Sequence, residues 1–143
     1  MNRHPANDAW ESLLEVHARL MRQFAAEDIW QDLSMREYDV LYTLSKCPRP
    51  VRISELNHHV LLSQPALSRL TDRLADKGLI ARQADPADHR GVLLSLTEHG
   101  RTRQREIGRR HGRGVARAMT TALSAEELRQ LGALLERFKD QPK

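Results

Sequence analysis

The chain has 143 residues, a length that suits one domain, and 40% of them are hydrophobic, 29% charged and only 4% aromatic. Its formal net charge of +4 favours polyanionic partners such as nucleic acid or an acidic membrane surface. No apolar run approaches the roughly 18 residues of a membrane span, and the first residues lack the apolar segment of a secretory signal. A single cysteine, Cys47, allows no internal disulfide. We therefore expect a cytoplasmic protein without membrane association.

The first third of the sequence predicts two helices. Residues 8–27 have an apolar face with spacings of three and four, followed by a break at 28–33. Ser34 and Glu37 have the spacing of a capping box, in which each side chain accepts the other residue's backbone N–H. The helix behind this box ends before Cys47, because prolines 48 and 50 cannot continue it.

The middle of the sequence predicts a helix-turn-helix followed by a hairpin. A short helix over about 53–59 precedes a longer one, which starts after Ser63 as N-cap and ends near Lys77 at Gly78. Two short strands, 80–84 and 92–96, flank a polar turn over 85–91. We therefore predict a mainly α-helical fold with a small β-wing, a winged helix-turn-helix whose second helix enters the major groove of DNA.

The last part of the sequence predicts two more helices. Thr97 can cap a long helix through about residue 121, and Ser124 with Glu127 forms a second capping box. The outer helices are apolar on one face, and a single domain of this length offers little internal surface to cover them. A second copy of the chain is the simplest partner. We expect a homodimer formed by residues 8–30 and 101–140, around a DNA-binding lobe of residues 34–100 within one domain of 1–143.

The start of the longer predicted helix carries side chains suited to duplex DNA. Glutamine can pair with adenine and arginine with guanine, a proline can touch a thymine methyl group, and small hydroxyls suit phosphate. An arginine at a hairpin tip can enter the minor groove. The alternative is a plain amphipathic helix with a solvated basic face. The candidate DNA-binding residues are Ser63, Gln64, Pro65, Ser68, Arg69, Thr71, Arg73 and Arg90.

Asp88 is an acidic residue at the predicted DNA-facing tip. A carboxylate in that place would repel phosphate, so we expect it to support the wing by holding Arg90, Arg82 or Arg73. The alternative is that Asp85 and Asp88 are ordinary turn formers, because aspartate suits turns.

From Ser54 to Gly100 the sequence resembles the DNA-binding lobe of the MarR family. The match consists of LSQPALSRLTDRL, then GLI-R, then D-x-R-G before VLLSLT, in the family's order. The resemblance implies an obligate dimer on a palindromic operator, usually a repressor, and often one released by a small aromatic or amphipathic effector. It implies base contacts by Gln64, Pro65, Ser68 and Arg69, backbone contacts by Ser63 and Thr71, and a minor-groove role for Arg90. It does not identify the effector pocket.

One departure from the family pattern lies in the turn before the longer helix. Where glycine is common, this chain has Val60-Leu61-Leu62, so we expect the turn to bend differently or to be strained at Leu61.

Other functions have weaker support in the sequence. Cys47 could sense oxidants, but it follows the second helix and has no evident activating partner. His58, His59 and His111 do not have the spacing of a metal site. Arginines between 101 and 117 form either a solvated face or an extension of the basic surface. We therefore expect no enzyme, cofactor or metal, and an effector-independent or architectural DNA-binding protein is the alternative to a ligand-responsive regulator.

Overall fold

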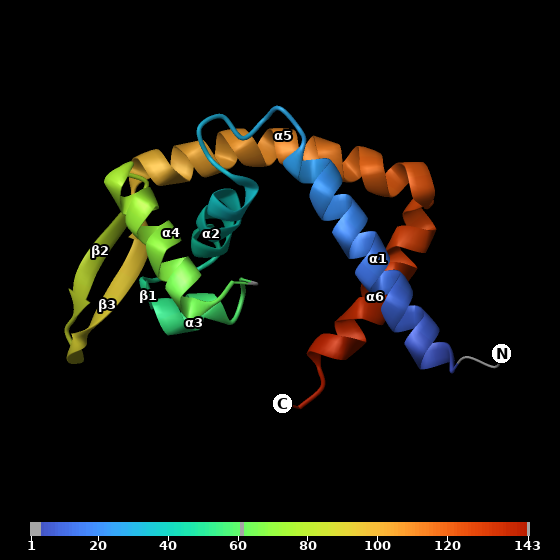
Figure 1. Cartoon of the computed structure of the whole chain (residues 1–143), viewed down its shortest axis with the longest axis horizontal. Coiled ribbons are helices and arrows are strands. Elements are labelled where there is room, and N and C mark those ends of the chain that lie inside the picture. The colour runs from blue at the N-terminus through green and yellow to red at the C-terminus, as the bar shows by residue number, and fades with distance from the viewer. Residues whose placement is uncertain (1–3, 61, 143) are drawn as a thin grey trace. The chain divides into compact units, whose positions relative to one another are not determined.

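A computed structural model describes residues 4–60 and 62–142 and is mainly helical, with one small sheet (Figure 1). Two compact units make up the chain. The central unit is Ala25–Arg110, and the terminal unit joins the residues up to Phe24 with those from His111 onward. The elements are α1 (Pro5–Ala25), α2 (Met35–Ser45), β1 (Val51–Arg52), α3 (Ile53–Asn57), α4 (Gln64–Asp76), β2 (Ile80–Asp85), β3 (Asp88–Leu96), α5 (Glu98–Ala122) and α6 (Ala125–Lys139).

The helix starts follow the predicted caps. Ser34 Oγ accepts the N–H of Glu37 at 3.1 Å, and Glu37 Oε1 accepts the N–H of Ser34 at 3.0 Å, so the predicted capping box of α2 is confirmed. Ser124 and Glu127 form the same box before α6. Side-chain acceptors satisfy backbone donors that would otherwise be unpaired in the first turn of each helix.

The recognition-type helix α4 also has the predicted ends. Ser63 Oγ accepts the N–H of Ala66 at 3.2 Å, and proline occupies the first turn. The helix stops at Gly78, whose φ of +74° lies in the left-handed region that glycine adopts without strain. Leu61, in the turn that we expected to bend differently or to be strained, lies outside the described residues.

The sheet corrects two expectations. It has three antiparallel strands in the order β1-β3-β2, and β1 was not predicted because two residues have no readable period. The predicted turn over 85–91 is only two residues long, since β3 already begins at Asp88 and pairs Asp88 with Asp85. Polar residues fit a strand here because most residues of the hairpin's outer half are exposed, so no alternation between a buried and a solvated face reveals the strand.

One hydrophobic core lies inside the central unit. Leu41 of α2, Leu67 and Leu74 of α4 and Ile107 of α5 are fully buried, together with Leu79 before β2. Gly100 lets α5 begin against this core, because a Cβ at that position would lie 2.0 Å from the carbonyl oxygen of Leu79. The core therefore fixes how α4 is rotated and where the hairpin leaves it.

The terminal unit has the opposite pattern. Phe24 is its buried residue on α1, and its ring meets the ring of His111 edge-on at 5.3 Å. The apolar faces of α1 and α6 are exposed on the single chain: Trp10, Leu13, Leu14, Val16, Leu134, Leu135 and Phe138. None of the helices in the described ranges is long and apolar enough to cross a membrane.

Candidate nucleic-acid interface

The outer face of α4 carries most of the candidate DNA-binding residues. Leu67, Leu70 and Leu74 of this helix are buried, so the opposite face turns outward. On that face the exposed candidates are Ser63, Gln64, Pro65, Arg69 and Arg73, and Ser68 is half-buried. The N-terminal end of the helix adds a partial positive charge that favours phosphate.

Thr71 is the least exposed of the candidates, although it lines the cleft between α4 and the hairpin. Its side chain is on the buried side of α4, with 2% of the residue exposed, and its hydroxyl donates to the carbonyl oxygen of Ser68 at 2.9 Å. Such low exposure argues against the predicted phosphate contact of Thr71. Residue type suggested the role, but position 71 lies four residues after Leu67 and shares its face of the helix.

The hairpin of β2 and β3 forms the wing beside α4. In Figure 1 the turn of this hairpin and the N-terminal end of α4 both point toward the bottom, whereas α5 begins at the top. Arg90 is exposed on β3, and no carboxylate of the described ranges pairs with its side chain. Arg82 of β2 instead pairs with Asp72 of α4, Nη1 to Oδ1 at 2.7 Å.

The carboxylates of the wing face an arginine that sequence reasoning missed. Arg52, at the end of β1, donates to Asp85 Oδ2 from Nε at 2.8 Å and from Nη2 at 2.5 Å. Its Nη2 also lies 3.5 Å from Asp88 Oδ2. The expectation that Asp88 holds Arg90, Arg82 or Arg73 is thus corrected: the partner is Arg52, more than thirty residues earlier in the chain.

The pKa of Asp85 is held below its ordinary value. The first cause is the backbone N–H of Ala87, which donates to Asp85 Oδ1 at 2.9 Å, and the second is the guanidinium of Arg52. The same pair raises the pKa of Arg52. Asp85 is therefore ionised at neutral pH, and its charge is balanced before any polyanion approaches.

A cleft of about 360 Å³ separates α4 from the hairpin. Three arginines and one aspartate line it, so its walls are basic overall. The side chains come from β1 and α3, from the outer side of α4, and from the two hairpin strands. They are Arg52, Ile53, Ser54, Gln64, Ser68, Thr71, Asp72, Arg82, Arg90, Gly91, Val92 and Leu94.

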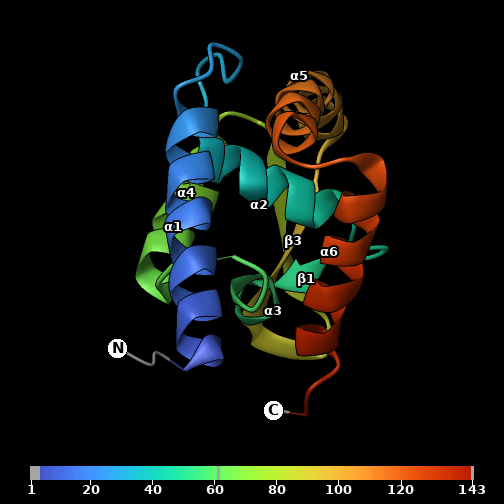
Figure 2. The same ribbon diagram turned by 90° about the vertical axis from the view of Figure 1, so that its right-hand side faces the viewer.

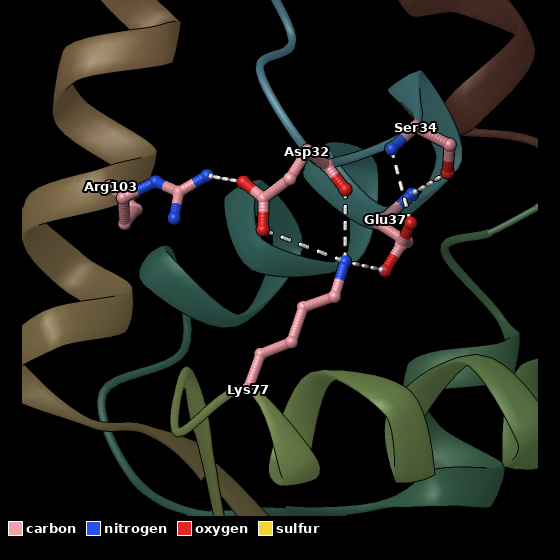
Figure 3. Close-up of polar contacts among 5 residues, drawn as sticks. All are labelled: Asp32, Ser34, Glu37, Lys77 and Arg103. Atoms are coloured by element: carbon pink, nitrogen blue, oxygen red, sulfur yellow. Dashed lines mark hydrogen bonds and ion pairs between the residues drawn. The ribbon is translucent and has the colours of Figure 1, made fainter.

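The far end of α4 is held by a second polar cluster (Figure 3). Lys77 Nζ donates to the carbonyl oxygen of Asp32 at 2.9 Å and lies 3.5 Å from the buried carboxylate of Glu37. Arg103 of α5 donates to Asp32 Oδ1 at 2.5 Å, which holds the pKa of Asp32 below its ordinary value. Gln31, just before Asp32, has a φ of +59°. These contacts tie the end of α4 to the α1–α2 loop and to α5.

The remaining candidates have ordinary surroundings. Cys47 is half-buried, and its thiol donates to the carbonyl oxygen of Thr43 at 3.4 Å. His58, His59 and His111 belong to no group of three potential metal ligands among the described residues. Trp30 and Tyr38 are buried in the core with ring centroids 5.4 Å apart.

The family model for the MarR family matches residues 33–92. The multiple antibiotic resistance protein MarR of Salmonella typhimurium is 32% identical over 107 residues, which are 75% of this chain and 74% of that protein. The chain belongs to the MarR family. MarR proteins are winged-helix transcription regulators that bind operator DNA, so this chain is a DNA-binding transcription regulator, and neither its family nor its structural neighbours are enzymes.

Two solved structures of MarR proteins on DNA have the same fold. A mutant of E. coli MarR complexed with operator DNA matches with a TM-score of 0.77 and 25% identity, covering 95% of this chain and 99% of that one. Sco3205, a MarR family transcriptional regulator from Streptomyces coelicolor in complex with DNA, matches with a TM-score of 0.79 and 25% identity over 100% and 93% of the two chains.

Proposed function

We propose that this MarR protein is a sequence-specific repressor that binds a palindromic operator as a homodimer. The observation that supports it is the α4–hairpin cleft, in which the polar face of α4 and the wing with its exposed Arg90 form the two walls. A helix beside a β-ribbon with an exposed arginine can contact the major and the minor groove of one duplex at once.

Seven of the eight candidate DNA-binding side chains have a role in this proposal. Gln64, Pro65, Ser68 and Arg69 contact base edges, because they lie in the first two turns of the helix that enters the major groove. Ser63 and Arg73 contact phosphate, and Arg90 enters the minor groove. Thr71 has no place among them, since it is buried.

The apolar faces of the terminal unit support the homodimer. Trp10 is 59% exposed and Phe138 is 73% exposed on the single chain, and both belong to a set of exposed large apolar residues on α1 and α6. Large exposed apolar patches mark protein–protein interaction sites. A second copy would cover both faces by two-fold symmetry and place two copies of α4 at a fixed spacing, which a palindrome matches. In this proposal α1, α6 and the second half of α5 are the dimerisation helices.

The proposal also includes release of the protein from its operator by a small aromatic or amphipathic effector. Only the family resemblance supports this part. The effector would bias the equilibrium between two spacings of the DNA-binding lobes. The alternative is a DNA-binding protein that responds to no effector. A panel of aromatic acids added to the protein–operator complex separates the two, because only the first is released at an effector concentration that leaves the protein folded.

Genomic affinity selection followed by a salt titration of the best fragment tests the proposed function. Enrichment of one palindrome, bound by two chains, is the expected result. A basic protein that binds only phosphate would enrich no motif, and its affinity would simply fall with salt. That outcome would show that the protein binds DNA without sequence specificity, and the proposed function would be wrong.

Arg69 provides a matched pair of variants. Arg69→Ala should cost about 1–3 kcal/mol at one base pair of the operator and relax specificity there. Arg69→Lys keeps the charge but not the paired donors, so it should lose the same base preference while keeping most of the affinity for unrelated DNA. If both variants keep the wild-type base preference, Arg69 does not contact a base.

A further inference from the structure

The outer half of the wing extends beyond the third strand of the sheet. β1 pairs only at Val51 with Leu94 and at Arg52 with Leu93, so from Val92 to the turn the hairpin has two strands. Its register shifts between Ala84 and Asp85. An isolated two-stranded ribbon is marginally stable in water, so this part of the wing needs another contact to hold one conformation.

Arg52 supplies that contact through its side chain. It is the last residue of β1, on the side toward the turn, and its guanidinium reaches Asp85 with two hydrogen bonds and Asp88 with a weaker ion pair. Asp85 and Asp88 are the residues on either side of the two-residue turn. One guanidinium therefore joins both ends of the turn to the third strand.

The same guanidinium lies against Gly91. A Cβ at Gly91 would be 2.9 Å from both Cζ and Nη2 of Arg52, so any larger residue would displace it. Asp88 Oδ1 accepts the backbone N–H of Arg90 at 3.1 Å. The backbone at Arg90 and Gly91 is thus held by a hydrogen bond to Asp88 and by the contact with Arg52.

We propose that Arg52 is the positioning residue of the wing: it fixes the Asp85–Asp88 turn and thereby directs Arg90 into the minor groove. The inference rests on the proposed function, because it assumes that Arg90 enters that groove. The charge of Arg52 is committed to Asp85, so Arg52 acts through Arg90 and does not itself bind phosphate.

Asp85→Asn distinguishes a positioning role of Arg52 from a direct phosphate contact, because the two roles predict different changes in DNA affinity. This variant removes a negative charge from a DNA-binding surface and frees Arg52. If Arg52 were a phosphate contact, the variant would bind DNA as tightly as the wild type or more tightly. If Arg52 positions the wing, affinity should fall about threefold or more despite the gain in net positive charge.

A double-mutant cycle with Arg90 tests the coupling. Fluorescence anisotropy on the selected operator should show that Arg52→Ala weakens binding about tenfold in the wild-type chain but less than about twofold in the Arg90→Ala chain. Arg52→Ala should also lose preference for A·T over G·C pairs in the flanking minor groove, which a general loss of stability would not change. Arg82→Ala is the matched control, since its partner Asp72 lies on α4 and its effect should add to that of Arg90→Ala.

Hydrogen exchange on the free protein tests the anchor without DNA. The amides of Ala87 and Arg90, which donate to Asp85 and Asp88, should exchange faster in Arg52→Ala, while Arg52→Lys, with one donor group, should lie between it and the wild type. If Arg90→Ala leaves DNA affinity unchanged, Arg90 does not enter the minor groove. If the amides of Ala87 and Arg90 exchange equally fast in Arg52→Ala and in the wild type, Arg52 does not hold the turn. Additive effects of Arg52→Ala and Arg90→Ala, or tighter binding by Asp85→Asn, would overturn the positioning role.

Discussion

The two units of this chain differ in how far their apolar side chains are buried. The central unit buries them: Leu67 and Val40 are 0% exposed. The terminal unit leaves Trp10 and Phe138 more than half exposed, although its helices are as strongly amphipathic as α4. Figure 2 shows α1 at the left and α6 at the right of the view, as separate helices.

The difference teaches that one unit completes its core within the chain and the other does not. Amphipathic helices are stable when the apolar face is covered, whether by the same chain or by another. Substitutions in the central unit should therefore change the unfolding of each chain, whereas substitutions on the exposed faces should change association.

The largest effect is expected in the central core. Leu67→Ala removes a side chain that is 0% exposed, so the free energy of unfolding should fall by about 2–5 kcal/mol. Val92→Ala, on the same unit but 49% exposed, is the control and should change it by less than about 0.5 kcal/mol. Urea unfolding followed by circular dichroism measures both. Equal losses would mean that Val92 is covered in solution.

The next effect concerns the exposed apolar faces. Phe138→Asp places a charge where a second copy is proposed to bind, so dimer affinity should fall by about 2 kcal/mol or more, roughly thirtyfold. Lys139→Ala, its neighbour on α6, removes a residue that pairs only with Glu136 of its own helix and is the control. Sedimentation equilibrium gives both affinities. A wild-type chain that stays monomeric at micromolar concentration would contradict the proposed dimer.

The smallest effect concerns two carboxylates of the central unit with opposite pKa shifts. Arg103 lowers the pKa of Asp32, so the ionised form contributes stability at neutral pH that is lost as pH falls from about 4 toward the lower folded value. Burial raises the pKa of Asp39, so its ionised form opposes folding at neutral pH. Asp32→Asn should lower Tm at pH 7 and Asp39→Asn should raise it, and each should change the free energy of unfolding by about 1 kcal/mol or less.

A pH series of melting curves checks these signs. Both differences from the wild type should shrink as the pH falls and the carboxylates are protonated in every chain. If Asp32→Asn raises Tm at pH 7, the contacts of Asp32 with Arg103 and Lys77 do not outweigh the cost of ordering the three side chains.

Much of the fold was predictable because local physics specifies it. The capping boxes at Ser34 and Ser124, the N-cap at Ser63 and the stop at Gly78 each depend on residues a few positions apart, and the structure confirms them. The recognition-type face of α4 followed from the same reasoning, since burial of three leucines on one side exposes the other.

The burial of Thr71 and the arginine partner of Asp88 could not be predicted from neighbouring residues in the sequence. The hydroxyl of Thr71 suited phosphate by residue type, but the packing of α4 against the core buries it. Arg52 meets Asp85 across 33 positions, and Arg103 meets Asp32 across 71, so no spacing in the sequence could reveal either pair.

The sequence by itself determined where the helices and the hairpin lie and which family the chain resembles, because caps, periodicity and turn residues act over a few positions. Only the tertiary structure decided how far Thr71 is buried, that a third strand exists at Val51–Arg52, and which arginine holds the wing. Those features depend on contacts between residues far apart in the chain, which form only when the core of the central unit brings their backbones together.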